Sequence, residues 1–135
     1  MNLPTTRTEI QIRYSDLDTL GHVTNTVYAV YLELARVRWF LAVPDQLVAS
    51  VVANLNIDFL GEIKLEDSVY VATRCIKVGN KSIQLAQDIH ANERCVTRAV
   101  TTVVGFDPVA RKTVPLLAGW EPSVVEDQHS LDQSE

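Results

Sequence analysis

The chain begins with a segment in which polar and apolar residues alternate. In residues 9–14, EIQIRY, the alternation places Ile10, Ile12 and Tyr14 on one face. A period of two predicts a half-buried β-strand with that face toward the core.

A longer segment without Gly or Pro follows. Residues 26–42, TVYAVYLELARVRWFLA, carry only three charged side chains, and their apolar residues spread around much of the helical circumference. A helix on the surface of a small domain usually has one apolar stripe and a broad polar face. The pattern predicts a long helix that is capped by Thr24, Asn25 or Thr26, ends before Pro44 and is surrounded by the rest of the chain.

The remainder of the domain has the pattern of successive strands. Alternation or runs of β-branched residues predict strands over residues 54–60, 68–78, 81–91 and 94–106. Gly79-Asn80 is a hairpin signal between two of them, and Asn92-Glu93 separates the next pair more weakly. Short connections favour antiparallel pairing. We therefore expect an α+β fold in which a curved antiparallel β-sheet wraps one long central helix.

Composition indicates a globular domain. The 135 residues are 47% apolar, enough for one domain with a core. There is no apolar run of about eighteen residues that would predict a membrane span. The N-terminus lacks the pattern of a secretion signal, so a cytoplasmic location and reduced Cys75 and Cys95 are expected. Three scattered histidines do not suggest a metal site, and we expect no cofactor.

The net charge of −5 comes from the end of the chain. Residues 121–135 hold five acidic residues and no Lys or Arg, whereas the acidic and basic residues of 1–120 balance. This division predicts a domain over residues 1–120 and a flexible acidic tail over 121–135. Without a basic stripe, nucleic acid is not an expected partner. A neutral body still leaves room for a local basic patch that binds an anionic small molecule.

Residues 14–25, YSDLDTLGHVTN, place two carboxylates, a glycine and a histidine directly before the expected helix. The D-x-D-x-x-G-H-V-x-N spacing and the adjoining Y-x-x-Y-x-E-x-A-R pattern resemble hotdog-fold acyl-CoA thioesterases of the 4-hydroxybenzoyl-CoA thioesterase type. The likeness continues through IDFLGEIKLEDSVYV and KVGNKSIQLAQDI and covers roughly residues 7–115. It implies acyl-CoA as the substrate and sites at the subunit interface of a homodimer, often paired into a homotetramer.

Thioester hydrolysis needs a nucleophile, or a base that activates water, and a group that stabilises the oxyanion. The resemblance implies that Asp18 is the catalytic carboxylate, although an ordinary Asx-turn residue would also suit a loop. A helix N-terminus offers free N–H groups, so the backbone near Asn25 and Thr26 would polarise the carbonyl. His22 would orient Asp18, bind substrate or merely pack, and Asp16 is expected to be structural.

The phosphates of CoA call for cations. By the same resemblance we expect the nucleotide near the Gly79-Asn80 turn, with contacts from Lys77, Gly79, Lys81 and Ser82. Arg74 precedes Lys77 on the same strand, and a solvated strand edge explains all three cations equally well.

Two other functions stay open. A hotdog dehydratase acting on hydroxyacyl thioesters would need a paired acid and base, usually with a histidine, and His22 is the only one in the motif. A non-catalytic acyl-CoA-binding or regulatory hotdog protein would keep the fold without turnover, but the intact Asp18 motif argues against it. Another hotdog branch uses a helix carboxylate; here Glu33 is explained by an ion pair with Arg36 at i+3.

Overall fold

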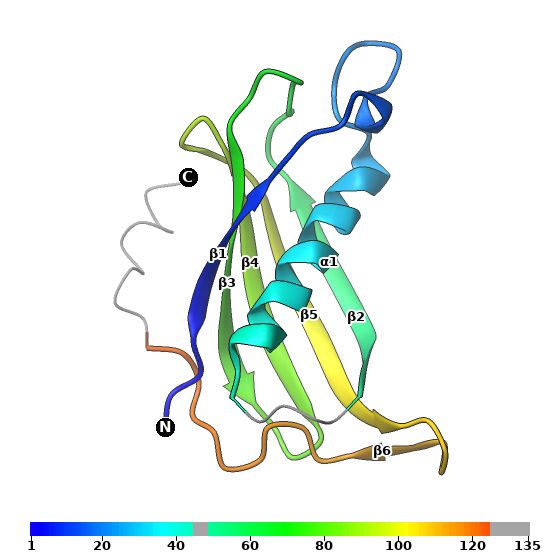
Figure 1. The fold of residues 1–135 in the computed structure, drawn as a ribbon, viewed down its shortest axis with the longest axis vertical. Helices are drawn as coiled ribbons and strands as arrows, with labels where there is room; N and C mark the ends of the chain where they lie inside the picture. Colours follow the sequence, from blue (N-terminus) through cyan, green and yellow to red (C-terminus); the bar gives the residue numbers. More distant parts are fainter. Residues whose placement is uncertain (45–48, 125–135) are drawn as a thin grey trace.

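The computed structural model describes residues 1–44 and 49–124, which form one helix against one antiparallel sheet (Figure 1). The elements in chain order are β1 (Thr5–Ile10), the 3₁₀ helix η1 (Tyr14–Asp16), α1 (Asn25–Ala42), β2 (Ser50–Phe59), β3 (Val69–Val78), β4 (Ser82–Ala91), β5 (Arg94–Asp107) and β6 (Lys112–Val114).

The six-stranded sheet has the order β1-β3-β4-β5-β2, with β6 paired to the end of β5. β3, β4 and β5 form a meander, whereas β2 pairs with β5 and not with its neighbour in sequence, β3. All pairings are antiparallel, and α1 lies against one face of the curved sheet (Figure 1). The expected architecture of one long helix and a curved antiparallel sheet is confirmed.

The first strand lies earlier than predicted. β1 ends at Ile10, and Tyr14 opens η1 instead of continuing a strand over residues 9–14. The carboxylate of Asp16 accepts a hydrogen bond from the N–H of Arg13 (3.0 Å), which closes this turn. Tyr14 is therefore 81% exposed and does not face the core.

The long helix is confirmed, and Asn25 is its first residue. Two hydrophobic clusters lie beneath it, one containing Leu32 and Ile89 and the other containing Trp39 and Leu85. Its opposite side leaves a row of apolar side chains exposed: Val30, Leu34, Val37 and Leu41. Their spacing of three and four residues places them on one face. Within one chain, the prediction that the helix is surrounded is therefore wrong.

Arg36 lies on the buried face of α1 and does not form the ion pair with Glu33 that the sequence predicts. Its guanidinium donates to Oε1 of Gln87 (3.2 Å). The Gln87 amide in turn donates to the carbonyl of Leu32 (3.0 Å) and to Oγ1 of Thr73 (3.1 Å). Burial lowers the pKa of Arg36. This polar layer ties α1 to β3 and β4 and holds the helix at one height on the sheet.

Both predicted hairpins are present. The N–H of Gly79 donates to the carbonyl of Ser82 (2.7 Å). Asn92 and Glu93 both have positive φ, 51° and 69°, as a type I′ turn requires. The second turn is thus better defined than its sequence indicates, since Glu is not a usual residue at such a position.

The start of the C-terminal tail is attached to the domain. The Leu3 N–H donates to the carbonyl of Glu121 (2.9 Å), and Oγ of Ser123 accepts the N–H of Cys75 (2.9 Å). Ser123 is buried. The predicted domain limit at residue 120 leaves these contacts out, because the sequence after it is polar and acidic. The rest of the expected tail, residues 125–135, lies outside the described residues.

Candidate active site

The stretch before α1 folds into a miniature hairpin, here called the acidic loop (residues 16–24). The N–H of Thr24 donates to the carbonyl of Asp16 (2.9 Å), and the N–H of Asp18 donates to the carbonyl of His22 (2.8 Å). Leu17 and Val23 form an antiparallel bridge between these bonds. This pairing fixes the position of Asp18 relative to Thr24, the N-cap of α1.

The carboxylate of Asp18 lies at the exposed tip of the acidic loop. Its Oδ1 accepts the N–H groups of Leu20 (2.9 Å) and His22 (3.1 Å), which is an Asx-type arrangement. Gly21 has φ +80°, a conformation that closes the tip and that residues with a side chain rarely adopt. The hydrogen bond from His22, supported by that from Leu20, lowers the pKa of Asp18. Both of these hydrogen bonds fall on Oδ1.

Asp16 has the opposite environment at the base of the same loop. It is 1% exposed, and its carboxylate accepts bonds from the Arg13 guanidinium (2.9 and 3.1 Å) and from the hydroxyl of Tyr31 (2.7 Å). Burial opposes ionisation, but the bonds from Arg13 and Tyr31 outweigh it, so the pKa of Asp16 lies below its usual value. This arrangement gives Asp16 the structural role expected from the sequence.

The N-terminus of α1 follows directly from the acidic loop. Thr24 is the N-cap, and its side chain makes no capping hydrogen bond. Asn25 and Thr26, the first two helical residues, are exposed. The first N–H groups of a helix have no partner within it and carry the positive end of its dipole. An anionic oxygen can therefore bind here, next to the loop that carries Asp18.

His22 contacts the segment between β2 and β3, which the sequence pattern does not single out. Its Nε2 lies 3.1 Å from a carboxylate oxygen of Glu62, and its backbone bridges to Lys64. Both side chains are partly exposed, His22 at 32% and Glu62 at 51%. The sequence gives no signal of this pair, because the contact depends on where the segment between β2 and β3 crosses the acidic loop.

The expected CoA contacts lie far from the acidic loop within one chain. β3 begins at Val69, which pairs with Ile10 just before the acidic loop, and ends at Val78, which pairs with Ile83. Ten strand residues span about 30 Å. The structure brings together one set of the candidate residues: Asp18, His22, Asn25 and Thr26. It places the other set at the opposite end of the sheet: Lys77, Gly79, Lys81 and Ser82.

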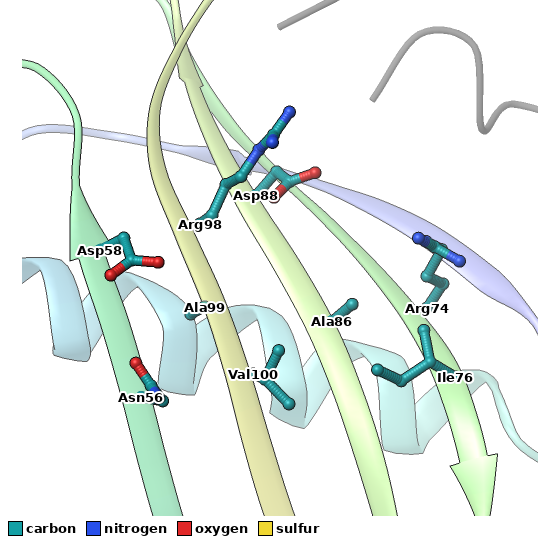
Figure 2. A pocket seen from close by; sticks show the side chains of 9 residues that line it. All are labelled: Asn56, Asp58, Arg74, Ile76, Ala86, Asp88, Arg98, Ala99 and Val100. Atoms are coloured by element: carbon teal, nitrogen blue, oxygen red, sulfur yellow. The ribbon is translucent and has the colours of Figure 1, made fainter. Parts of the chain in front are cut away.

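A separate hollow of about 360 Å³ lies on the sheet face opposite α1 (Figure 2). Its lining residues are Asn56, Asp58, Arg74, Ile76, Ala86, Asp88, Arg98, Ala99 and Val100. Burial raises the pKa of Asp88, although Arg98 and Arg74 act in the opposite direction. Of these residues the sequence pattern marks Arg74, as a candidate cation for CoA; each of the others is an ordinary member of an alternating strand.

In residues 1–44 and 49–124, no group of three or more His, Cys, Asp or Glu side chains is placed to hold a metal ion. Over the same residues, no helix combines the length and apolar character needed to cross a membrane.

Comparison with known proteins gives consistent matches. A model of the thioesterase-like superfamily matches residues 12–123. The structure of a thioesterase from Thermus thermophilus, complexed with coenzyme A and Zn, is 32% identical; the match covers 87% of this chain and 94% of that one, with a TM-score of 0.75. A predicted thioesterase from Bacillus stearothermophilus is 25% identical over 85% of this chain and 90% of its own, with a TM-score of 0.77. The uncharacterized protein YsmA of Bacillus subtilis (strain 168) is 24% identical over 102 residues, which are 70% of this chain and 69% of that protein.

Proposed function

The chain belongs to the thioesterase-like superfamily, and from this premise we propose that it is an acyl-CoA thioesterase of the 4-hydroxybenzoyl-CoA thioesterase type. The observation that carries the proposal is the exposed carboxylate of Asp18, held by a loop that is hydrogen-bonded to the N-cap of α1. Thioester hydrolysis requires a nucleophile or base, which a carboxylate supplies, and a group that stabilises the oxyanion, which free helical N–H groups supply.

Asp18 acts as general base or as nucleophile. Its lowered pKa keeps it ionised at neutral pH, and its Oδ2 is available for chemistry because Oδ1 takes the loop hydrogen bonds. As base, it removes a proton from the water that attacks the thioester carbon; the C–S bond then breaks and the CoA sulfur takes the proton. As nucleophile, it forms an acyl anhydride with release of the CoA thiolate, and water then hydrolyses the anhydride.

The negative oxygen of either tetrahedral intermediate is stabilised by the backbone N–H groups of Asn25 and Thr26. Their side chains are not needed for this role. His22 belongs to the same loop as Asp18, and with Nε2 directed at Glu62 its Nδ1 is the ring atom left to contact the substrate.

CoA binding requires a second copy of the chain in this proposal. β2 is an edge strand with exposed apolar side chains, among them Leu55 (37%) and Phe59 (49%). Antiparallel pairing of two β2 edges about a twofold axis sets opposite ends of the two sheets beside each other. The hairpin with Lys81 in one subunit then approaches the acidic loop of its partner, and the nucleotide lies between them.

Release of free thiol from a panel of acyl-CoA thioesters of different chain length and polarity tests the proposal. Hydrolysis of at least one member, with equal amounts of acid and CoA formed, is the expected result. Formation of a 2-enoyl thioester from a hydroxyacyl substrate would instead support a dehydratase. Saturable binding of acyl-CoA without any turnover would support a regulatory protein.

A further inference from the structure

We propose that Tyr31 is a positioning residue for the acidic loop: its hydroxyl holds Asp16 and thereby fixes Asp18 relative to the N-terminus of α1. This inference rests on the proposed function for its catalytic consequence, but its structural part can be tested without any turnover.

Asp16 uses all of its polar atoms to join three parts of the chain. Its N–H donates to the carbonyl of Arg13 (2.9 Å) and its carbonyl accepts the N–H of Thr24 (2.9 Å). Its carboxylate accepts from the N–H and guanidinium of Arg13 and from the hydroxyl of Tyr31. The residue therefore connects η1, the acidic loop and the body of α1.

The donors to the carboxylate of Asp16 are not equivalent. The backbone and guanidinium donors belong to Arg13, three residues earlier, whose side chain is 67% exposed; they stabilise the turn itself. The hydroxyl donor belongs to Tyr31, which is buried and lies fifteen residues later in the second turn of α1. Tyr31 thus provides the side-chain link between this turn and the helix interior.

The link fixes the position of Asp18 through the miniature hairpin. The bond between Asp16 and Thr24 is at the base of this hairpin, and the bond between Asp18 and His22 is near its tip. Burial and the adjacent Asp16 carboxylate raise the pKa of Tyr31, so its hydroxyl stays protonated and remains a donor. If the base shifts against the helix, the tip moves with it. A displacement of about 1 Å between a base and its substrate is enough to slow a reaction strongly.

The variant Tyr31→Phe removes this hydroxyl and keeps the ring in the core. With a hydrolysed acyl-CoA, kcat is expected to fall about tenfold while KM changes less than about twofold, because the CoA contacts are elsewhere. Amide hydrogen exchange at Asp18 and Thr24 should accelerate by about tenfold, since their N–H groups close the hairpin.

Thr73→Val is the matched control. It removes another buried hydroxyl, the acceptor for Gln87, from the middle of β3 and far from the acidic loop. Thr73→Val should lower Tm about as much as Tyr31→Phe does, because each variant loses one buried hydroxyl. It should leave kcat and the amide exchange at Asp18 and Thr24 unchanged. If Tyr31→Phe does not fold, Asp16→Asn weakens the same hydrogen bond while keeping the side-chain shape and should give the same split between kcat and KM.

Wild-type kcat and exchange rates in Tyr31→Phe would overturn the inference, as would an equal loss of kcat in Thr73→Val. If the wild-type protein hydrolyses no member of the acyl-CoA panel, the proposed function fails. The exchange measurement then still decides whether Tyr31 holds the acidic loop.

Discussion

Asp16 and Asp18 lie two positions apart in one loop, yet their carboxylates have opposite environments. Asp16 is buried and accepts hydrogen bonds from Arg13 and Tyr31, whereas Asp18 is exposed and accepts only N–H groups of its own loop. The first carboxylate holds the backbone in place, and the second has an oxygen left for chemistry. Substitution of each should therefore affect different properties.

Asp18→Asn is expected to reduce hydrolysis of a good acyl-CoA substrate by about 100-fold or more, the scale of a general base. The substitution keeps size and much of the hydrogen bonding while removing charge and basicity. KM should change much less, because phosphates and acyl chain contact other residues. Steady-state kinetics of the purified variant measures both quantities. Asp18→Ala belongs beside it, since asparagine can deamidate slowly to aspartate.

Asp16→Asn is the control for this prediction. It should destabilise the protein more than Asp18→Asn does, because a buried hydrogen-bonded carboxylate loses strong acceptor bonds. Its kcat should fall only about tenfold, through the displaced loop, and so far less than that of Asp18→Asn. Turnover that survives both Asp18 substitutions but disappears in a folded Asp16→Asn protein would mean that Asp16 is the catalytic carboxylate. If no substitution at either position changes turnover, the mechanism proposed above is wrong.

The sequence predicts the elements whose pattern is local. The helix after Thr24 and the hairpin at Gly79 follow from composition and turn chemistry within a few residues. The contact between His22 and Glu62 depends on two distant segments crossing, and no periodicity encodes it. The apolar row containing Leu34 suggested a surrounded helix, because one sequence cannot distinguish burial within a chain from burial against another.

Asp88→Asn is expected to stabilise the protein at pH 7. Burial raises the pKa of Asp88, so the native state binds its proton more tightly than the unfolded chain does. Its ionised form therefore destabilises the fold, and an uncharged amide avoids this cost. The advantage of the variant should shrink as pH falls through the raised pKa of Asp88 and vanish below the ordinary value of 3.8. Urea unfolding of both proteins at several pH values measures the difference; a variant less stable at pH 7 would contradict the prediction.

Truncation should separate the attached and unattached parts of the C-terminus. Removal of residues 125–135 is expected to leave stability and turnover near wild type, because the segment is polar and acidic. Truncation after Trp120 also removes Ser123, whose hydroxyl accepts from Cys75 and donates to Pro4. Loss of buried hydrogen bonds there should cost about 1–3 kcal/mol in unfolding free energy. Equal stability of the two truncated proteins would show that these contacts contribute nothing.

The protein should form a dimer through the β2 edge. Sedimentation equilibrium at micromolar concentration is expected to give at least twice the chain mass of 15.1 kDa. Leu55→Glu should weaken the dimer at least about tenfold, since it places like charges near the twofold axis. Val109→Glu, at a side chain that is 92% exposed outside β2, is the control and should leave the dimer intact. A wild-type protein that sediments only as a monomer would remove both the dimer and the interface site.

If the site is shared between subunits, two different impaired variants should regain hydrolytic activity when they form mixed dimers. Asp18→Ala lacks the proposed catalytic carboxylate, and Lys81→Ala has a weakened contact with CoA. A dimer with one subunit of each kind contains one site with both residues intact, because Asp18 comes from one chain and Lys81 from the other.

Each variant alone should hydrolyse poorly when the acyl-CoA concentration is well below KM, where the loss of a CoA contact is visible. After subunit exchange in an equal mixture, half of the dimers are mixed, so activity should recover to about a quarter of wild type. The acidic loop and the Lys81 hairpin lie at opposite ends of β3 in one chain, so recovered activity would indicate that the two residues of a site come from different subunits. If both residues acted in one chain, mixed dimers would contain no intact site, and the mixture would show only the average of the two separate activities.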